Sequence, residues 1–162
     1  MEHARPATLD DLDIVAALWD LGVAELDGQR GGSLLAGALA RPDLSGWLRA
    51  VLSDPERLIT LGFLESVPVG LASTYCERDR REPVGVVELI YVEPEARQVG
   101  VAEAMLEVVM PWCQAQGCRG VDAPALPGSR PAKAFFEDNG FLARLLVMHR
   151  ALPNGTGGGT RG

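Results

Sequence analysis

Apolar residues follow a helical spacing near the start of the chain. After a short β-type segment at residues 3–7, Thr8 and Asp11 stand at the spacing of a helix cap. Apolar side chains then recur every three or four residues, which predicts a helix that ends at the Gly31-Gly32 pair. The positions in this stripe are Leu12, Val15, Trp19, Val23 and Leu26. A second helical stretch follows, through residues 34–40 and, after a proline, through residues 44–52.

The middle of the chain has a β-type pattern. Segments 58–63, 69–76 and 84–92 are rich in β-branched and apolar residues, and turn signals separate them. We therefore expect three strands. Gly85, near the start of the third segment, indicates a β-bulge at that point.

The helical pattern returns after Pro94, with one apolar face and an internal proline. Pro111 predicts a kink or an early end of this helix. The face consists of Ala102, Leu106, Val109 and Cys113.

The last part of the folded region predicts a strand over residues 121–126, a helix over 129–139 ended by Gly140, and a final strand over 141–152. The fold class is therefore α/β, a mixed β-sheet flanked by helices in the order β-α-α-β-β-β-α-β-α-β.

The length of 162 residues suits one domain, which we place at residues 3–152. Residues 153–162 form a glycine-rich tail, PNGTGGGTRG, that has nothing to bury. We expect this tail to be disordered.

Charge and cysteine content exclude several function classes. The chain has 15 basic and 22 acidic residues, a net charge of −7, which disfavours binding to nucleic acid or to an anionic membrane. No apolar run approaches the ~20 residues of a membrane span, and the polar N-terminus is unlike a signal peptide. The three cysteines lack metal-ligand spacing. We expect reduced thiols, no metal and a cytoplasmic protein.

The segment most informative about chemistry is residues 86–106. A β-branched strand runs into a turn at Glu93-Pro94, and a helix then opens around Gly100 and Ala102. Small residues let a ligand approach the backbone, and the free N–H groups of a helix N-terminus bind a pyrophosphate without a lysine. The alternative is an ordinary tight strand-to-helix turn with one glycine.

Two motifs in this order resemble those of the GNAT superfamily of N-acyltransferases. Arg97-x-x-Gly100-x-Ala102 resembles the acyl-CoA-binding pattern [QR]-x-x-G-x-[GA]. The run from Ala132 to Phe141 resembles the closing signature A-x-x-x-[YF]-E-x-x-G-F. The resemblance implies a GNAT-like fold and acetyl-CoA as co-substrate.

The resemblance also implies roles for individual positions. Backbone N–H groups of the turn would bind the coenzyme A pyrophosphate. The edge of the preceding strand would pair with the pantetheine arm and, at Tyr91, polarise the thioester carbonyl. Ser129 would contact the coenzyme, and Lys133 would either assist its phosphates or remain a solvated helix charge. The expected cofactor-binding set is Ile90, Tyr91, Val92, Arg97, Gln98, Val99, Gly100, Val101, Ala102, Ser129, Lys133 and Phe136.

The sequence departs from the family pattern at two places. Gln98-Val99 replaces a more usual glycine-basic pair, which removes one cationic side chain from the phosphate site. Phe136 stands where many members carry a tyrosine that protonates the departing thiolate. Tyr75 and Cys76 are weak candidates to replace that proton donor.

Glu88 is the expected general base, acting directly or through water. It lies within an apolar strand, and partial burial suits a carboxylate to accept a proton near neutral pH. The alternative is a glutamate that points to solvent from one face of the strand.

The resulting hypothesis is an N-acetyltransferase that acts on a small-molecule or peptide amine. A catalytically silent acyl-CoA sensor and an unrelated small-ligand α/β domain are the alternatives. Six acidic residues and no basic residue lie between residues 10 and 27, on the acceptor side of GNAT-like folds. This charge favours a cationic amine, or it is simply a solvated helix face. The resemblance also allows a homodimer.

Overall fold

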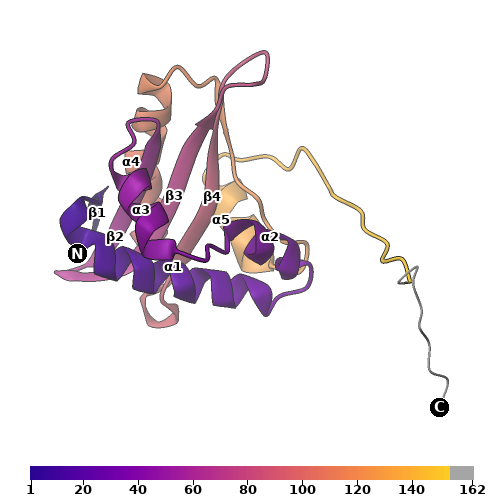
Figure 1. Cartoon of the computed structure of the whole chain (residues 1–162), viewed down its shortest axis with the longest axis horizontal. Coiled ribbons are helices and arrows are strands. Elements are labelled where there is room, and N and C mark those ends of the chain that lie inside the picture. Colours follow the sequence, from indigo (N-terminus) through magenta and orange to yellow (C-terminus); the bar gives the residue numbers. More distant parts are fainter. Residues whose placement is uncertain (154–162) are drawn as a thin grey trace.

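The computed structural model describes residues 1–153 and contains a five-stranded mixed sheet in the order β1-β2-β3-β4-β5 (Figure 1). β1 to β4 are antiparallel neighbours, and β5 runs parallel to β4. The strands are β1 (Glu2–Pro6), β2 (Arg57–Leu64), β3 (Val67–Glu77), β4 (Val84–Val92) and β5 (Gly120–Asp122). The fold class predicted from the sequence is confirmed.

Helices cover both faces of the sheet. The helices are α1 (Leu12–Asp27), α2 (Gly32–Leu39), α3 (Leu44–Leu52), α4 (Val101–Ala115) and α5 (Arg130–Asp138). α1 and α3 pack on one face, and α4 packs on the other (Figure 1). The predicted helical stripe is confirmed in α1, where Val15 and Trp19 are fully buried. No helix within residues 1–153 combines the length and the apolar character that a bilayer crossing requires.

Successive side chains of the central strands alternate between two separate cores, as the period of a strand requires. On β4, Leu89 and Tyr91 belong to the core beneath α1 and α3. Val87 and Val92 belong to the core beneath α4. The alternation is interrupted once on β4, because Val87 and Leu89 are two residues apart and yet belong to different cores.

The second helical stretch is two helices rather than one. α2 ends at Leu39, and the Asp43 side chain caps α3 by accepting a hydrogen bond from the Gly46 N–H at 3.0 Å. Pro42 lies in the turn between them, since proline cannot donate a helix hydrogen bond. The early helix end expected at Pro111 is wrong, because α4 continues to Ala115 with the proline on its exposed side.

The bulge predicted at Gly85 is also wrong. Gly85 pairs regularly with Cys76 on β3 and with Val121 on β5. Its role is packing, because a Cβ atom at this position would lie 2.5 Å from the Cys113 sulfur of α4. The register shift occurs instead opposite the Ser73-Thr74 bond of β3.

The end of the chain differs most from the prediction. β5 has three residues, of which only Val121 and Asp122 belong to the predicted strand 121–126, because Pro124 cannot donate to a strand ladder. The strand predicted over residues 141–152 is wrong. This segment forms no strand, is exposed from Leu142 onward, and runs away from the domain (Figure 1). Apart from Pro153, the predicted disordered tail 153–162 lies outside the described residues.

Candidate active site

β4 has an unpaired edge at its C-terminal half. β5 pairs with β4 only at Val84, Gly85 and Val86. Within residues 1–153, no strand pairs with that edge of β4 from Val87 to Val92. Backbone N–H and C=O groups there are available to a ligand with amide groups of its own.

The turn after β4 contains two residues with left-handed backbone conformation. A short 3-10 turn, Pro94–Ala96, follows the strand. Gln98 then has φ of +65° and Gly100 has φ of +92°. A glutamine in this region is strained, since its Cβ atom crowds the backbone, and such strain concentrates at functional sites. The glycine that commonly occupies this kind of position in the GNAT-like pattern has no such cost.

The turn presents backbone N–H groups at the start of α4. Gly100 is the N-cap residue, and no side chain caps the first turn of the helix. The unpaired N–H groups and the helix dipole make this end of α4 attractive to an anion. A Cβ atom at Gly100 would lie 3.1 Å from Glu2 Cγ of β1, so the glycine also permits a close approach.

Arg97 fixes the turn in place. Its Nε atom donates to the Val92 carbonyl oxygen at 2.8 Å, and its Nη2 atom donates to Glu25 Oε1 of α1 at 2.5 Å. Its guanidinium group lies 5.8 Å from the centre of the Tyr91 ring. Arg97 therefore connects the end of β4 to α1 through its own side chain.

Glu88 occupies a β-bulge. Ser73 pairs with Leu89 and Thr74 pairs with Val87, so Glu88 has no partner on β3. Bulges redirect a side chain and are frequent beside active sites. The Glu88 side chain is 14% exposed and accepts a hydrogen bond from Ser73 Oγ at 2.8 Å.

Arg57 of β2 forms an ion pair with Glu88. The guanidinium group also lies over two aromatic rings, 5.0 Å from Trp47 of α3 and 5.1 Å from Tyr75 of β3. The structure thus collects an acid, a base, a hydroxyl and two aromatic rings on the face that α1 and α3 cover. Sequence reasoning missed Arg57, Trp47 and Ser73, because they come from three elements that only the folded sheet brings together.

The two weak candidates for the missing proton donor lie on opposite faces of the sheet. Tyr75 belongs to the group around Glu88, and burial together with the Glu88 charge raises the pKa of its phenol. The phenol therefore stays protonated at neutral pH. Cys76 contacts Cys118 on the face that α4 covers.

α5 contains the remaining predicted site residues. Lys133 pairs with Glu137 at 2.5 Å on the exposed surface, and Ser129 is the N-cap residue. Phe136 is buried against Phe141, with ring centres 5.1 Å apart. The predicted helix end at Gly140 is confirmed, with φ of +86°.

α5 lies beside α4 but apart from the Glu88 group. Asn139 at its C-terminal end lines a hollow together with Glu103 and Met110 of α4. Within residues 1–153, no side chain of α5 forms a hydrogen bond or ion pair with β4 or with the turn. The structure therefore brings together the predicted residues from Glu88 to Ala102 and places Ser129, Lys133 and Phe136 on a separate element.

The acidic stretch identified in the sequence lies on and just before α1. Asp11 and Glu25 form ion pairs with Arg5 and Arg97. The other four carboxylates are exposed and have no ion-pair partner among residues 1–153: Asp10, Asp13, Asp20 and Asp27. Within the same residues, no three histidine, cysteine or acidic side chains are arranged to hold a metal ion.

Comparisons with known proteins agree with this geometry. The model of the acetyltransferase (GNAT) family matches residues 16–141. An aminoglycoside N(6′)-acetyltransferase type 1 of Stenotrophomonas maltophilia is 31% identical over 94 residues, which are 58% of this chain and 60% of that protein. The alignment thus spans less than two thirds of the relative's length.

Solved structures share the fold at low identity. A structure of AAC(6′)-Iy in complex with the bisubstrate analogue CoA-S-monomethyl-acetylneamine has a TM-score of 0.73 and 18% identity, and it covers 94% of this chain and 99% of its own. An acetyltransferase from Clostridium acetobutylicum with acetyl-CoA has a TM-score of 0.70 and 13% identity, covering 93% and 96% of the two chains.

Proposed function

Because the chain belongs to the acetyltransferase (GNAT) family, we propose that it transfers the acetyl group of acetyl-CoA to a primary amine. One observation carries the proposal. The unpaired edge of β4 leads, through a turn with two left-handed residues, to the uncapped N-terminus of α4. A chain of amides that ends in a pyrophosphate suits this arrangement, since a strand edge pairs with amides and a helix N-terminus binds anions.

Acetyl-CoA is proposed to bind along β4 and the turn. The backbone of Ile90, Tyr91 and Val92 pairs with the pantetheine arm and polarises the thioester carbonyl. Backbone N–H groups of residues 98–102 hold the pyrophosphate. The role of Arg97 is to position these groups, because its side chain is bonded to Val92 and Glu25 rather than directed to a phosphate.

α5 is proposed to contact the coenzyme from the side. Ser129 and Lys133 are its polar contacts. Phe136 packs inside the domain and supplies no proton, so the donor must come from elsewhere.

Glu88 is the proposed general base. The Arg57 ion pair and the Ser73 hydrogen bond hold its side chain on the face that α1 and α3 cover. The neutral amine attacks the thioester carbon and its proton passes to Glu88, directly or through water. As the C–S bond breaks, the thiolate of coenzyme A takes a proton from the Tyr75 hydroxyl, which is then restored from solvent.

The proposed acceptor is a cationic amine of the aminoglycoside class. Four carboxylates on or beside α1, which have no ion-pair partner in the described residues 1–153, provide a field that attracts ammonium groups. Trp47, beside Arg57 and Glu88, offers an aromatic surface for a sugar or amino-sugar ring. The curated relative is an aminoglycoside N(6′)-acetyltransferase, which points to the same class.

Release of coenzyme A thiol tests the function. The purified chain is incubated with acetyl-CoA and neamine, a polyamine or a basic peptide, and thiol release is measured with and without each amine. Amine-dependent release with neamine supports the proposal. No release above background with any amine overturns it.

An acyl-CoA sensor is the second candidate, and Phe136 in place of a tyrosine is the observation that favours it. A sensor binds acetyl-CoA without turning it over. At about a hundred times Kd, ligand adds ~2.7 kcal/mol of stability, so binding is visible as a higher Tm. A raised Tm with no amine-dependent thiol release identifies the sensor.

We further propose that the chain forms a homodimer through residues 141–152. Six large apolar side chains of this segment are 65–88% exposed: Leu142, Leu145, Leu146, Val147, Met148 and Leu152. Such an apolar extended segment favours pairing with a sheet edge of another chain. β5 offers a free edge in a second copy, and exchange of this segment would bury the apolar residues.

Light scattering on the full chain tests the dimer. The wild type is expected to have the mass of a dimer at micromolar concentration, and the double substitution of Leu145 and Val147 to Asp is expected to be monomeric. The matched control replaces the exposed Arg150, which forms no ion pair among residues 1–153, with Asp and should remain dimeric. A monomeric wild type contradicts the proposal.

A further inference from the structure

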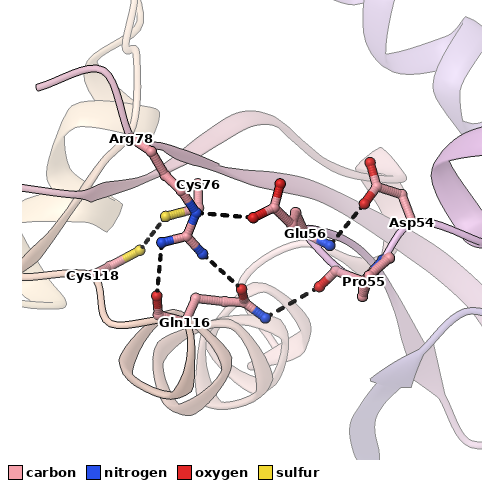
Figure 2. Close-up of polar contacts among 7 residues, drawn as sticks. All are labelled: Asp54, Pro55, Glu56, Cys76, Arg78, Gln116 and Cys118. Carbon is pink, nitrogen blue, oxygen red and sulfur yellow. Dashed lines mark hydrogen bonds and ion pairs between the residues drawn. The ribbon is translucent and has the colours of Figure 1, made fainter.

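Three cysteines gather on the face of the sheet that α4 covers, away from the Glu88 group. The Cys76 and Cys118 sulfur atoms are 2.9 Å apart, and both side chains are partly exposed (Figure 2). Cys113 is buried in α4 against Gly85. Cys76 lies near the end of β3, and Cys118 lies in the link between α4 and β5, so the contact joins segments that are distant in sequence.

Polar contacts hold both cysteine-bearing segments in place (Figure 2). Arg78 donates to the Gln116 main-chain oxygen at 3.1 Å and to its side-chain Oε1 at 3.0 Å. It also pairs with Glu56 at 3.0 Å, while Gln116 Nε2 donates to the Pro55 carbonyl oxygen at 3.2 Å. Arg78 and Gln116, each two positions along the chain from one of the two cysteines, therefore hold the two sulfur atoms near each other.

We propose that Cys76 and Cys118 form a reversible intramolecular disulfide when the protein meets a low-molecular-weight disulfide such as oxidised glutathione. The sulfurs already touch, and a bond of about 2.05 Å needs a movement of under ~1 Å, within the reach of side-chain rotation. This inference is independent of the proposed acetyltransferase activity, because it rests on the contact between two cysteines that lie apart from the Glu88 group.

The exchange proceeds in two steps. The Cys76 thiolate attacks one sulfur of the small disulfide, which forms a mixed disulfide and releases one small thiol. Cys118 then attacks the Cys76 sulfur and displaces the second small thiol. Two protein thiols are oxidised, one small disulfide is reduced to two thiols, and the two protons pass from the protein to those thiols.

The order of attack follows from burial. Burial raises the pKa of Cys118 to about 12 and that of Cys113 to about 11, which disfavours both thiolates. Cys76 is therefore the attacking group, and Cys118 resolves the mixed disulfide as its proton leaves with the small thiol.

The bond would close a loop of the chain that contains most of the proposed acetyl-CoA site. Residues 77–117 contain β4, the turn at residues 98–100 and α4. A cross-link across a loop of this length restricts the unfolded chain, so oxidation is expected to raise Tm by on the order of 5 °C or more.

Thiol titration of the unfolded protein tests the proposal after incubation with oxidised glutathione and removal of small thiols. Titratable thiols of the wild type should fall from three to one, and the Cys113→Ser variant should fall from two to none. The Cys76→Ser and Cys118→Ser variants should form no intramolecular disulfide. Peptide mapping of the oxidised wild type without reduction identifies the linked pair directly, so the test does not depend on how well the variants fold.

The outcomes separate clearly. A linked peptide that contains Cys76 and Cys118, with a higher Tm that a reducing agent reverses, supports the proposal. Three remaining thiols, a bond that includes Cys113, a glutathione adduct that persists without ring closure, or a disulfide between two molecules would each overturn it.

Discussion

Glu88 depends on its neighbours for the position of its side chain. The bulge removes its partner on β3, and Arg57 and Ser73 hold the carboxylate on the face covered by α1 and α3. The sequence identified the residue from its apolar surroundings. It did not identify the bulge, because a bulge is a property of how two strands pair and not of one strand alone.

Replacing Glu88 with Gln is expected to lower kcat by about 10²–10⁴-fold, since the isosteric amide cannot accept the amine proton. The KM for acetyl-CoA should change little, because the proposed coenzyme contacts begin at Ile90. Steady-state thiol release measures both constants. Glu107→Gln, an exposed position on α4, is the matched control. If Glu88→Gln keeps wild-type kcat, Glu88 is not the base.

Tyr75→Phe is expected to lower kcat by roughly tenfold or more, because the thiolate then loses its proton donor. Tyr91→Phe is the control, since the proposed role of Tyr91 belongs to its backbone. Equal kcat values for the two variants and the wild type would assign thiolate protonation to water.

The turn between β4 and α4 was predicted well at the level of the element. Strand, turn and helix occur where the pattern placed them, since β-branched and helical spacings are local signals. The aromatic and basic group around Arg57 was not predictable in this way. Its members come from α3, β2 and β3, and the pattern of each element gives no sign of the others.

Gln98→Gly is expected to raise the free energy of unfolding by about 0.5–1 kcal/mol, because glycine adopts φ of +65° without crowding. Chemical denaturation measures the change. Val99→Gly is the control, since Val99 does not have positive φ, and it should be neutral or destabilising. A loss of stability in Gln98→Gly would show that the glutamine side chain compensates for the strain.

The ion pair between Arg5 and Asp11, just before α1, predicts that the stability of the fold depends on pH. A hydrogen bond from Arg5 is the main cause that lowers the pKa of Asp11 to about 2 in the folded state. The folded pKa lies below the unfolded value, so the contribution is complete above pH 3.8 and is lost as the pH falls towards 2. Asp11→Asn should cost about 1–2 kcal/mol at pH 7, after allowance for the half-exposed Arg5, and almost nothing at pH 2. An equal cost at both pH values would contradict this origin.

At the scale of the whole molecule, the fold class was predicted correctly from the sequence. The strand predicted over residues 141–152 was not found in the structure. Residues 141–152 are rich in apolar residues, from which a strand was predicted, yet within residues 1–153 this segment pairs with no strand and the outer edge of β5 stays free. The pattern is thus consistent with pairing to a second copy. The net charge of −7 is likewise unevenly distributed, with the densest acidity on and before α1.

If that acidity attracts a cationic acceptor, the KM for neamine should rise several-fold between about 0.05 and 0.3 M salt, because exposed charges are screened over about 10 Å at 0.1 M. The KM for acetyl-CoA serves as the internal control and should rise much less. Insensitivity of the neamine KM to salt would contradict electrostatic attraction by α1.

The most direct test of the central claim follows both products of one reaction. The chain is incubated with acetyl-CoA and neamine, coenzyme A thiol is titrated, and the amine is examined by mass spectrometry. The account predicts one acetyl group on neamine for each coenzyme A released, with both products lost in Glu88→Gln. A chain whose Tm rises with acetyl-CoA, but which yields neither product with neamine, a polyamine or a basic peptide, would contradict it.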